Sequence, residues 1–104
     1  MVTLKDFVKI LDSTGLPVAE RCFPEDDAPG LPFICYLTEG SNNFGADGIV
    51  YYSAMKVSVE LYTKRKDESI EAMVENALAS FYWEKSEEYI DDEDCHLTTY
   101  ELEV

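Results

Sequence analysis

The spacing of apolar residues changes its period between Lys56 and Trp83, and this stretch organises the predicted fold. Val57, Val59 and Leu61 alternate with polar residues, which is typical of a strand with one apolar face. From residue 68 the apolar residues recur every three or four positions, as they do on one stripe of a helix. That stripe comprises Ile70, Met73, Val74, Ala77, Leu78 and Phe81, with Glu68, Glu71, Glu75 and Asn76 off it. We predict a strand over 56–65 and a helix over 68–83, capped by Asp67, that packs on the strand's apolar face.

A second amphipathic pattern near the N-terminus predicts a helix that begins after Thr3. The Thr3 side chain can cap this helix, and Asp6 three residues later approximates a capping box. Val2 and Phe7 stand where a hydrophobic staple forms across such a cap. We expect Gly15 to end the helix in a left-handed conformation. The buried stripe predicted for this helix is Leu4, Phe7, Val8 and Leu11.

The middle of the chain predicts strands separated by turn-rich segments. Residues 18–23 favour a short edge strand, and residues 24–30 an acidic loop. Residues 31–40 predict a strand that is apolar on both faces, which is typical of a central strand or of one whose outer face meets a partner. Residues 41–48 predict a hairpin loop, because Asp47-Gly48 is a strong turn signal. A return strand over 49–54 then leads into the strand that begins at Lys56.

The C-terminal part predicts one more strand and completes the fold. Residues 86–95 are interpreted as an acidic connector with at most a short strand, and residues 96–104 alternate as a final strand. The order is helix, weak strand, three strands, helix and strand. We predict a single α+β domain over 1–104, a two-layer sandwich of an antiparallel sheet of about four to five strands with two helices packed on one face.

The charge of the chain is strongly negative and lopsided. The sequence holds 22 acids and 8 bases, a formal net charge of −14. Residues 67–104 contain 13 of those acids and a single base. DNA phosphates would meet a repelling field, which argues against chain-wide DNA binding. Acidic proteins that mimic DNA exist, although solubility is the commoner reason for acidity.

Three widely spaced cysteines, Cys22, Cys35 and Cys95, form no metal-binding pair and no disulfide framework, which favours a reducing cytosol. The N-terminus carries acids and lysines inside its apolar pattern, unlike a signal peptide. No apolar run approaches the length needed to cross a bilayer. We therefore expect a soluble protein.

The residues predict no catalytic, cofactor or metal site. His96 is the one histidine, and its neighbour Cys95 should point to the opposite face of the final strand, so the two cannot easily form a dyad. The acidic run Asp91, Asp92, Glu93 and Asp94 lacks the spacing of a calcium loop. We expect a non-enzymatic protein without a cofactor. A site that gathered His96 with several carboxylates around an ion would contradict this expectation.

Tyrosine and polar residues predict a contact surface instead. Tyr36, Tyr62, Tyr100 and one of Tyr51 and Tyr52 are expected on the sheet face away from the helices, and tyrosine is enriched at interfaces. The alternative is an ordinary exposed face of an antiparallel sheet. The candidate assembly surface is Tyr36, Asn42, Asn43, Phe44, Asp47, Tyr52, Glu60, Tyr62 and Tyr100.

Several segments together resemble a known class of small proteins. These are the capped N-terminal helix, the PEDDAPGLPFICYL segment, the SNNFGADG hairpin, the VSVELYTKRKD strand end and the short amphipathic helix that follows. The chain resembles small tail-terminator and head–tail joining (minor tail) proteins of tailed bacteriophages and prophages of Gram-positive bacteria. The resemblance covers most of the chain and contains no catalytic motif.

The resemblance implies a structural role in virion assembly. Such subunits form a ring, generally hexameric, at the head-proximal end of the tail tube, where they contact the major tail tube protein and the head connector proteins. DNA would pass through the ring without specific binding, because acidic walls repel phosphates. Assembly would take place in the host bacterial cytoplasm, and the protein would end in the virion tail or head–tail junction. Because the copies repel one another, we expect a monomer in isolation at low salt.

A second hypothesis from another class remains open. The chain could be an acidic inhibitor or DNA mimic that binds a host nucleic-acid enzyme. That function requires carboxylates spaced like phosphates on one surface, and the acidic C-terminal portion is the candidate for it.

Overall fold

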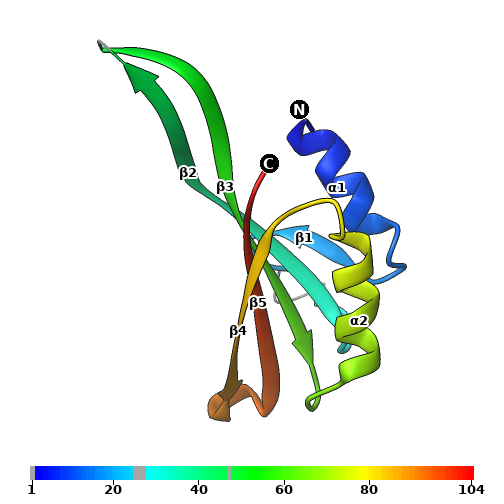
Figure 1. The fold of residues 1–104 in the computed structure, drawn as a ribbon. Coiled ribbons are helices and arrows are strands. Elements are labelled where there is room, and N and C mark those ends of the chain that lie inside the picture. The colour runs from blue at the N-terminus through cyan, green and yellow to red at the C-terminus, as the bar shows by residue number, and fades with distance from the viewer. Residues whose placement is uncertain (1, 25–27, 47) are drawn as a thin grey trace.

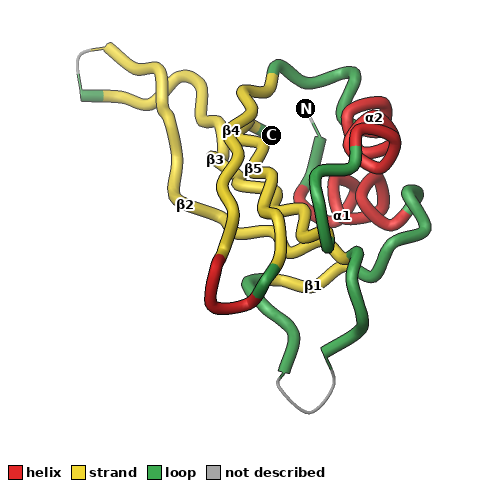
Figure 2. Tube along the Cα trace, turned by 90° about the horizontal axis from the view of Figure 1, so that it is seen from below, coloured by secondary structure: helices red, strands yellow, loops and turns green. Residues whose placement is uncertain are grey.

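Two helices lie on one face of a five-stranded sheet, which gives the protein two layers (Figures 1 and 2). The structure is a computed structural model that describes residues 2–24, 28–46 and 48–104. The predicted α+β class and the packing of both helices on the sheet are confirmed. The elements in chain order are α1 (Leu4–Asp12), β1 (Val18–Glu20), β2 (Phe33–Ala46), β3 (Ile49–Thr63), α2 (Glu68–Ala77), β4 (Trp83–Ile90), the 3-10 turn η2 (Asp91–Glu93) and β5 (Cys95–Glu103).

The sheet is mixed, whereas the sequence predicted an antiparallel one. The strand order is β1-β2-β3-β5-β4, and the pairs from β2 to β4 are antiparallel. The short edge strand β1 runs parallel to β2, with Val18 opposite Ile34. A parallel pair cannot be joined by a tight hairpin turn, and twelve residues separate the end of β1 from the start of β2.

Both helices begin where the capping residues predict. The Thr3 hydroxyl accepts a hydrogen bond from the Asp6 amide at 3.1 Å, and the Asp67 carboxylate accepts from the amides of Ser69 and Ile70. The predicted left-handed residue after α1 is also present, because Gly15 has a φ of 82°. Local side-chain chemistry therefore sets these boundaries.

Helix α2 ends earlier than its apolar period predicts. It stops at Ala77, and Trp83 is already the first residue of β4. The Trp83 ring packs edge-on against Tyr100, with ring centroids 5.3 Å apart. Phe81 packs in the same manner against Phe7 of α1. These aromatic contacts with other elements require the chain to leave the helix axis and turn toward the sheet edge.

The core lies between the helices and the sheet. Its strand residues include Val57, Val59 and Leu61, the apolar face predicted for this strand. Val74 of α2 and Leu78, the residue that follows this helix, also belong to the core, whereas Met73 of the predicted stripe is exposed. The remaining members of the buried core are Phe7, Leu11, Ile34, Tyr36, Tyr100 and Leu102.

Strand β4 lies where the sequence predicted an acidic connector. Its eight residues pair with β5 along the edge of the sheet, from Trp83 opposite Leu102 to Ile90 opposite Cys95. Between Trp83 and Ile90 the strand is exposed and rich in glutamate. An edge strand with so little apolar surface produces no alternating pattern, and for this reason sequence reasoning missed it.

The β2–β3 hairpin is much longer than predicted. Residues 41–46 continue β2 instead of forming a loop, and β3 is one continuous strand from Ile49 to Thr63. The register continues to Ala46 opposite Ile49, on either side of the predicted turn signal, of which position 47 is outside the described residues. The distal part of this hairpin, residues 41–46 and 49–54, is called the arm below.

The arm gives the molecule its elongated shape. It extends away from the helices and from β4 and β5 (Figure 1). The principal extents are 49 × 26 × 23 Å, and the radius of gyration is 14.9 Å. A compact domain of this length would have a radius of gyration of about 13 Å. The difference indicates that the arm adds length without adding to the packed body.

Candidate functional site

The arm has no third strand beside it in the described part of the chain. The pairing of β3 with β5 ends at Lys56 opposite Glu103, and backbone hydrogen bonds between Met55 and Val104 close the shared region. Beyond this point β2 and β3 pair with each other. At the root of the arm, one side-chain hydrogen bond joins Asn42 of β2 to Glu103 of β5. A two-stranded ribbon of this kind is only marginally stable in water by itself.

Large apolar side chains are exposed on the arm. Ile49 and Val50 are each 56% exposed, close to the turn. The polar side chains of the arm bond across the ribbon, since the Ser53 hydroxyl donates to Asn43 Oδ1 at 2.6 Å. The arm therefore ends in apolar surface that the chain itself leaves uncovered in the residues described.

Two glycines shape the arm at its irregular points. The β2–β3 register shifts between Thr38 and Gly40 and again between Phe44 and Gly45. Gly40 has a φ of 115°, which side chains rarely tolerate. A Cβ atom at Gly45 would lie 2.3 Å from the carbonyl oxygen of Ile49, so only glycine fits there. The bend at the root and the tight approach at the tip are therefore encoded in the sequence.

The predicted assembly surface is divided by the structure. Tyr36 and Tyr100 belong to the core on the helix side, so their expected position on the open face was wrong. Tyr36 of β2 and Tyr100 of β5 both stand opposite Val59 of β3, one on each side of that strand. This register places both tyrosines on the face of the sheet that carries the apolar side chains of β3. The side chains of Phe44, Tyr51 and Tyr52 and the whole of Asp47 lie outside the described residues.

The residues of the predicted surface that are exposed or half-buried occupy two places. Asn42 and Asn43 are exposed on the arm. Glu60 and Tyr62 are half-buried on the outer face of the sheet, where the Tyr62 hydroxyl donates to Glu60 Oε1 at 3.2 Å. Phe33 stacks on Tyr62 with centroids 5.0 Å apart, and Phe23 packs on Phe33. The outer face is therefore partly covered by the segment that follows β1.

Burial on the outer face changes the protonation of two groups. Burial raises the pKa of the Glu60 carboxyl, and the Tyr62 hydrogen bond offsets this only in part. Burial, with Glu60 nearby, also raises the pKa of the Cys35 thiol to about 11. A thiol with so high a pKa is a weak nucleophile at neutral pH.

A groove of about 520 Å³ opens at the arm root. It is lined by Glu39, Lys56, Val57, Tyr82, Glu84, Glu101, Leu102 and Glu103.

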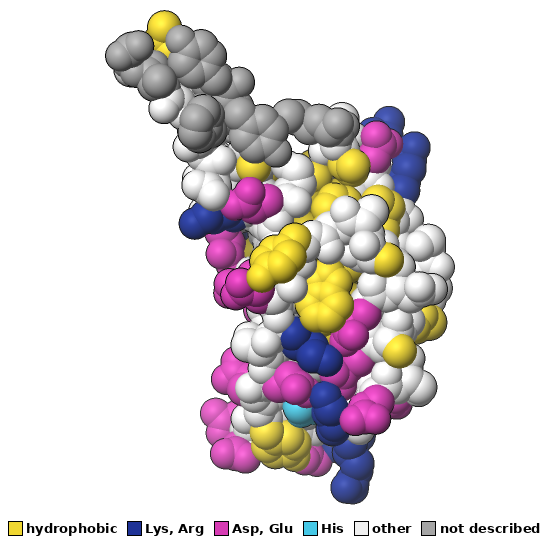
Figure 3. All heavy atoms as spheres, in the orientation of Figure 1, with side chains coloured by type: hydrophobic (Ala, Val, Ile, Leu, Met, Phe, Trp, Pro, Cys, Tyr) yellow, Lys and Arg dark blue, Asp and Glu magenta, His cyan; other side chains and the backbone are white. Residues whose placement is uncertain are grey.

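A network of charged side chains fills the opposite end of the helix–sheet layer. Lys66 Nζ lies 2.8 Å from Glu71 Oε1 and 2.5 Å from Glu87 Oε1. Lys85 Nζ bridges Glu71 and Glu75 at 3.0 and 2.9 Å. Figure 3 shows charged side chains of both signs gathered around the histidine on this part of the surface. We call Lys66, Glu71, Glu75, Lys85, Glu87 and His96 the charged cluster.

Glu71 is the buried centre of the charged cluster. Its side chain is 3% exposed, although the helix pattern placed it off the buried stripe. Burial alone would raise the pKa of Glu71, but hydrogen bonds from Lys66 and Lys85 outweigh burial and hold this pKa below its ordinary value. Hydrogen bonds from Lys66 and then His96 lower the pKa of Glu87 as well. Both carboxylates are therefore ionised at neutral pH.

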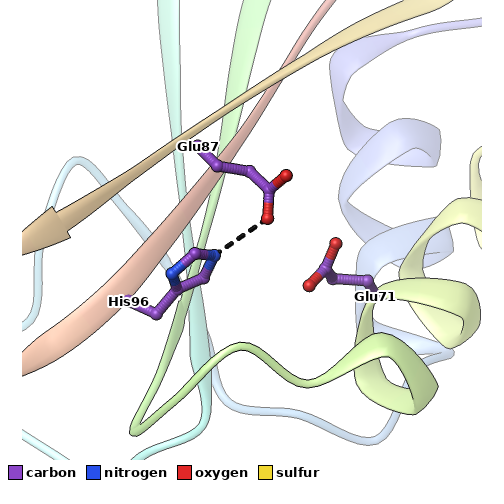
Figure 4. Close-up of side chains that lie close together, drawn as sticks. All are labelled: Glu71, Glu87 and His96. Atoms are coloured by element: carbon purple, nitrogen blue, oxygen red, sulfur yellow. Dashed lines mark hydrogen bonds and ion pairs between the residues drawn. The ribbon is translucent and has the colours of Figure 1, made fainter.

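His96 lies in the charged cluster and not beside a thiol. Its Nε2 is 3.0 Å from Glu87 Oε1, and Figure 4 shows the Glu71 carboxylate of α2 facing this pair. Cys95 lies on the other face of β5, as the alternation predicted. Glu71, Glu87 and His96 each offer one potential metal-ligand atom, and these atoms lie within 4.8 Å of one another. Sequence reasoning did not bring these three residues together, because one comes from α2 and another from the missed strand.

Comparison with known proteins adds no family. No protein-family model matches the chain, and a search of the curated proteins finds no match. Neither helix in the described part of the chain is long and apolar enough to cross a membrane.

Proposed function

We propose that this chain is a non-enzymatic structural subunit of a phage or prophage tail. Its role would be that of a tail terminator or head–tail joining protein, which assembles as a hexameric ring at the head-proximal end of the tail tube. The observation that carries the proposal is the arm, whose exposed Ile49 and Val50 extend beyond the packed body. The resemblance of the sequence to small tail proteins supplies the assembly in which such an arm would act.

The physical reason is that the arm requires a partner to be well ordered. A two-stranded ribbon gains little stability in water, and exposed strands with apolar side chains readily pair with another chain. Burying Ile49 and Val50 against a neighbouring copy would remove apolar surface from water. We therefore assign the arm to contacts with the next subunit in the ring and with the major tail tube protein.

The charge distribution agrees with a ring through which DNA passes unbound. With a net charge of −14, the chain offers DNA phosphates no general attraction. The same charge makes copies repel one another, and salt screens that repulsion. We expect light scattering to report a monomer at low salt and micromolar concentration, with association rising along a salt series. A stable hexamer at low salt would contradict this part of the proposal.

The competing function, an acidic inhibitor of a nucleic-acid enzyme, loses part of its candidate surface. Glu71, Glu75 and Glu87 are paired with lysines in the charged cluster, so they do not offer free charges to a nuclease. The carboxylates that remain on the outer face, such as Glu84 and Glu101, are cross-strand neighbours. Capture of a host nuclease in place of tail tubes would favour this second function.

The test uses the arm directly. Purified tail tubes should retain the wild-type chain, whereas Ile49→Glu and Val50→Glu variants should be lost from them or fail to form rings. Met73→Glu and Tyr82→Glu are matched controls, because both residues are exposed apolar side chains outside the arm. Tails assembled without the protein should be overlong and lack heads in negative-stain images. Normal tails assembled with the arm variants would overturn the proposal.

A further inference from the structure

Two buried polar atoms, one in the charged cluster and one beside it, lack a partner in the described part of the chain. Glu71 Oε2 and Thr98 Oγ1 are buried and make no hydrogen bond to any residue that the structure describes. Their residues are 2% and 0% exposed. Buried polar groups are almost always satisfied in native proteins, so unsatisfied oxygens on Glu71 and on Thr98, the cross-strand partner of Glu87, point to a ligand in this region.

The sheet register brings these atoms to the same place as His96 and Glu87. Thr98 is the direct cross-strand partner of Glu87, and His96 lies two residues earlier on the same face of β5. Glu71 approaches that face from α2, with its carboxylate toward Glu87 and His96 (Figure 4). Two carboxylates, an imidazole and a buried hydroxyl therefore converge from three elements of the fold.

We propose that Glu71, Glu87 and His96 form a binding site for a divalent transition-metal ion of the zinc type, with the Thr98 hydroxyl beside it. One imidazole nitrogen and two carboxylate oxygens are a ligand set that Zn²⁺ accepts, at bond lengths of about 2.0–2.2 Å. The ligand atoms now lie within 4.8 Å of one another. Because Glu87 Oε1 is already 3.0 Å from His96 Nε2, the approach that metal binding still requires is that of the Glu71 carboxylate to this pair. Zinc binding here would contradict the expectation of a protein without a metal site, whereas the role proposed for the arm does not depend on it.

The Lys66 ammonium occupies the position proposed for the metal ion. Its ammonium bridges the carboxylates of Glu71 and Glu87, and its side chain is 44% exposed. A long, half-exposed lysine can move into solvent, while Lys85 keeps its bond to Glu71 Oε1 and leaves Oε2 for the ion. The metal and the Lys66 ammonium therefore compete for the same two carboxylates, which distinguishes this site from a simple ion-pair network.

Because the metal and Lys66 compete, removing Lys66 and removing His96 should change the zinc affinity in opposite directions. Zinc titrated into the chelator-treated full chain should bind with one-to-one stoichiometry by calorimetry. Lys66→Met should bind zinc at least tenfold more tightly, whereas His96→Gln should lose at least tenfold. Lys64→Met removes a surface lysine paired with Asp94 and should leave the affinity unchanged. Cys22→Ser should also bind as wild type does, which excludes the exposed thiol as the ligand.

A second readout does not depend on any variant folding. The chain has one histidine, so its two ring-proton resonances are unambiguous. Stoichiometric Zn²⁺ should shift them, whereas Mg²⁺ at the same concentration should not, because Mg²⁺ prefers oxygen ligands. Unchanged histidine resonances would overturn the proposal. Equal zinc affinity in wild type, Lys66→Met and His96→Gln would also overturn it, since the ion would then be held by other acidic groups.

Discussion

The arm and the helix–sheet body differ in how far the chain covers their apolar side chains. In the body, apolar side chains such as Phe7 and Leu61 are fully buried, and even the buried carboxylate of Glu71 receives two lysines. In the arm, Ile49 and Val50 are more than half exposed, and the strands pair only with each other in the residues described. The body therefore covers its large apolar side chains by its own contacts, whereas the arm presents apolar surface that a second molecule can cover. We propose that this difference separates the part that folds from the part that assembles.

The largest expected effect comes from truncating one large apolar residue in each region. Phe7→Ala removes a buried ring that packs against Phe81 and should lower the free energy of unfolding by about 3–5 kcal/mol. Ile49→Ala removes a branched side chain from the arm and should change it by no more than about 0.5 kcal/mol. Urea denaturation of the isolated chain measures both. Similar losses for the two variants would mean that the arm is part of the cooperative core.

The charged cluster gives the next largest effect. Glu71→Gln removes the charge that Lys66 and Lys85 share in a buried position, and it should lower the free energy of unfolding by about 1–3 kcal/mol. The matched control is Glu101→Gln, an exposed carboxylate on the outer face, for which a change within about 0.5 kcal/mol is expected. The two variants are compared by denaturant unfolding at pH 7. An equal effect of both substitutions would show that Glu71 is not a structural centre of the body.

A smaller effect of opposite sign is expected at Glu60, whose pKa is raised because the carboxyl is partly buried. The native state therefore binds the Glu60 proton more tightly than the unfolded chain does, so the wild type gains stability from this group as pH falls through its folded pKa. Glu60→Gln cannot be charged and keeps an oxygen to accept from Tyr62. It should raise the Tm by a few degrees at pH 7, and the gain should shrink toward pH 4. A gain in Tm that grows as the pH falls would contradict a raised pKa of Glu60.

Sequence reasoning succeeded where local chemistry decides the structure. The caps at Thr3 and Asp67 set the starts of both helices, and the alternation through Val57, Val59 and Leu61 identified the strand on which they pack. The Asp47-Gly48 signal lies between the paired residues Ala46 and Ile49, although Asp47 itself is outside the described residues. These features depend on neighbouring residues, and one sequence is enough to read them.

Sequence reasoning failed where the structure depends on contacts between residues that are far apart in the chain. Strand β4 is stabilised by pairing with β5 and by the contacts of Lys85 and Glu87 with α2 and the loop before it, none of which leaves an apolar alternation. Glu71 carries a charge that argues for exposure, and only lysines from elsewhere in the chain allow its burial. Tyr36 lies on a strand with two apolar faces, so the pattern did not say which face the helices cover. The charged cluster could not be predicted without the missed strand.

Hydrogen exchange tests the central claim most directly, because it reports the arm and the body in one experiment. In the isolated chain, amides of residues 41–46 and 49–54 should exchange much faster than those of Val57, Val59 and Leu61 in the core. On binding to purified tail tubes or on ring formation, the arm amides should become protected while the core amides remain as they were. Arm amides that stay unprotected in the assembled state, with new protection elsewhere, would contradict the assignment of the arm as the assembly element.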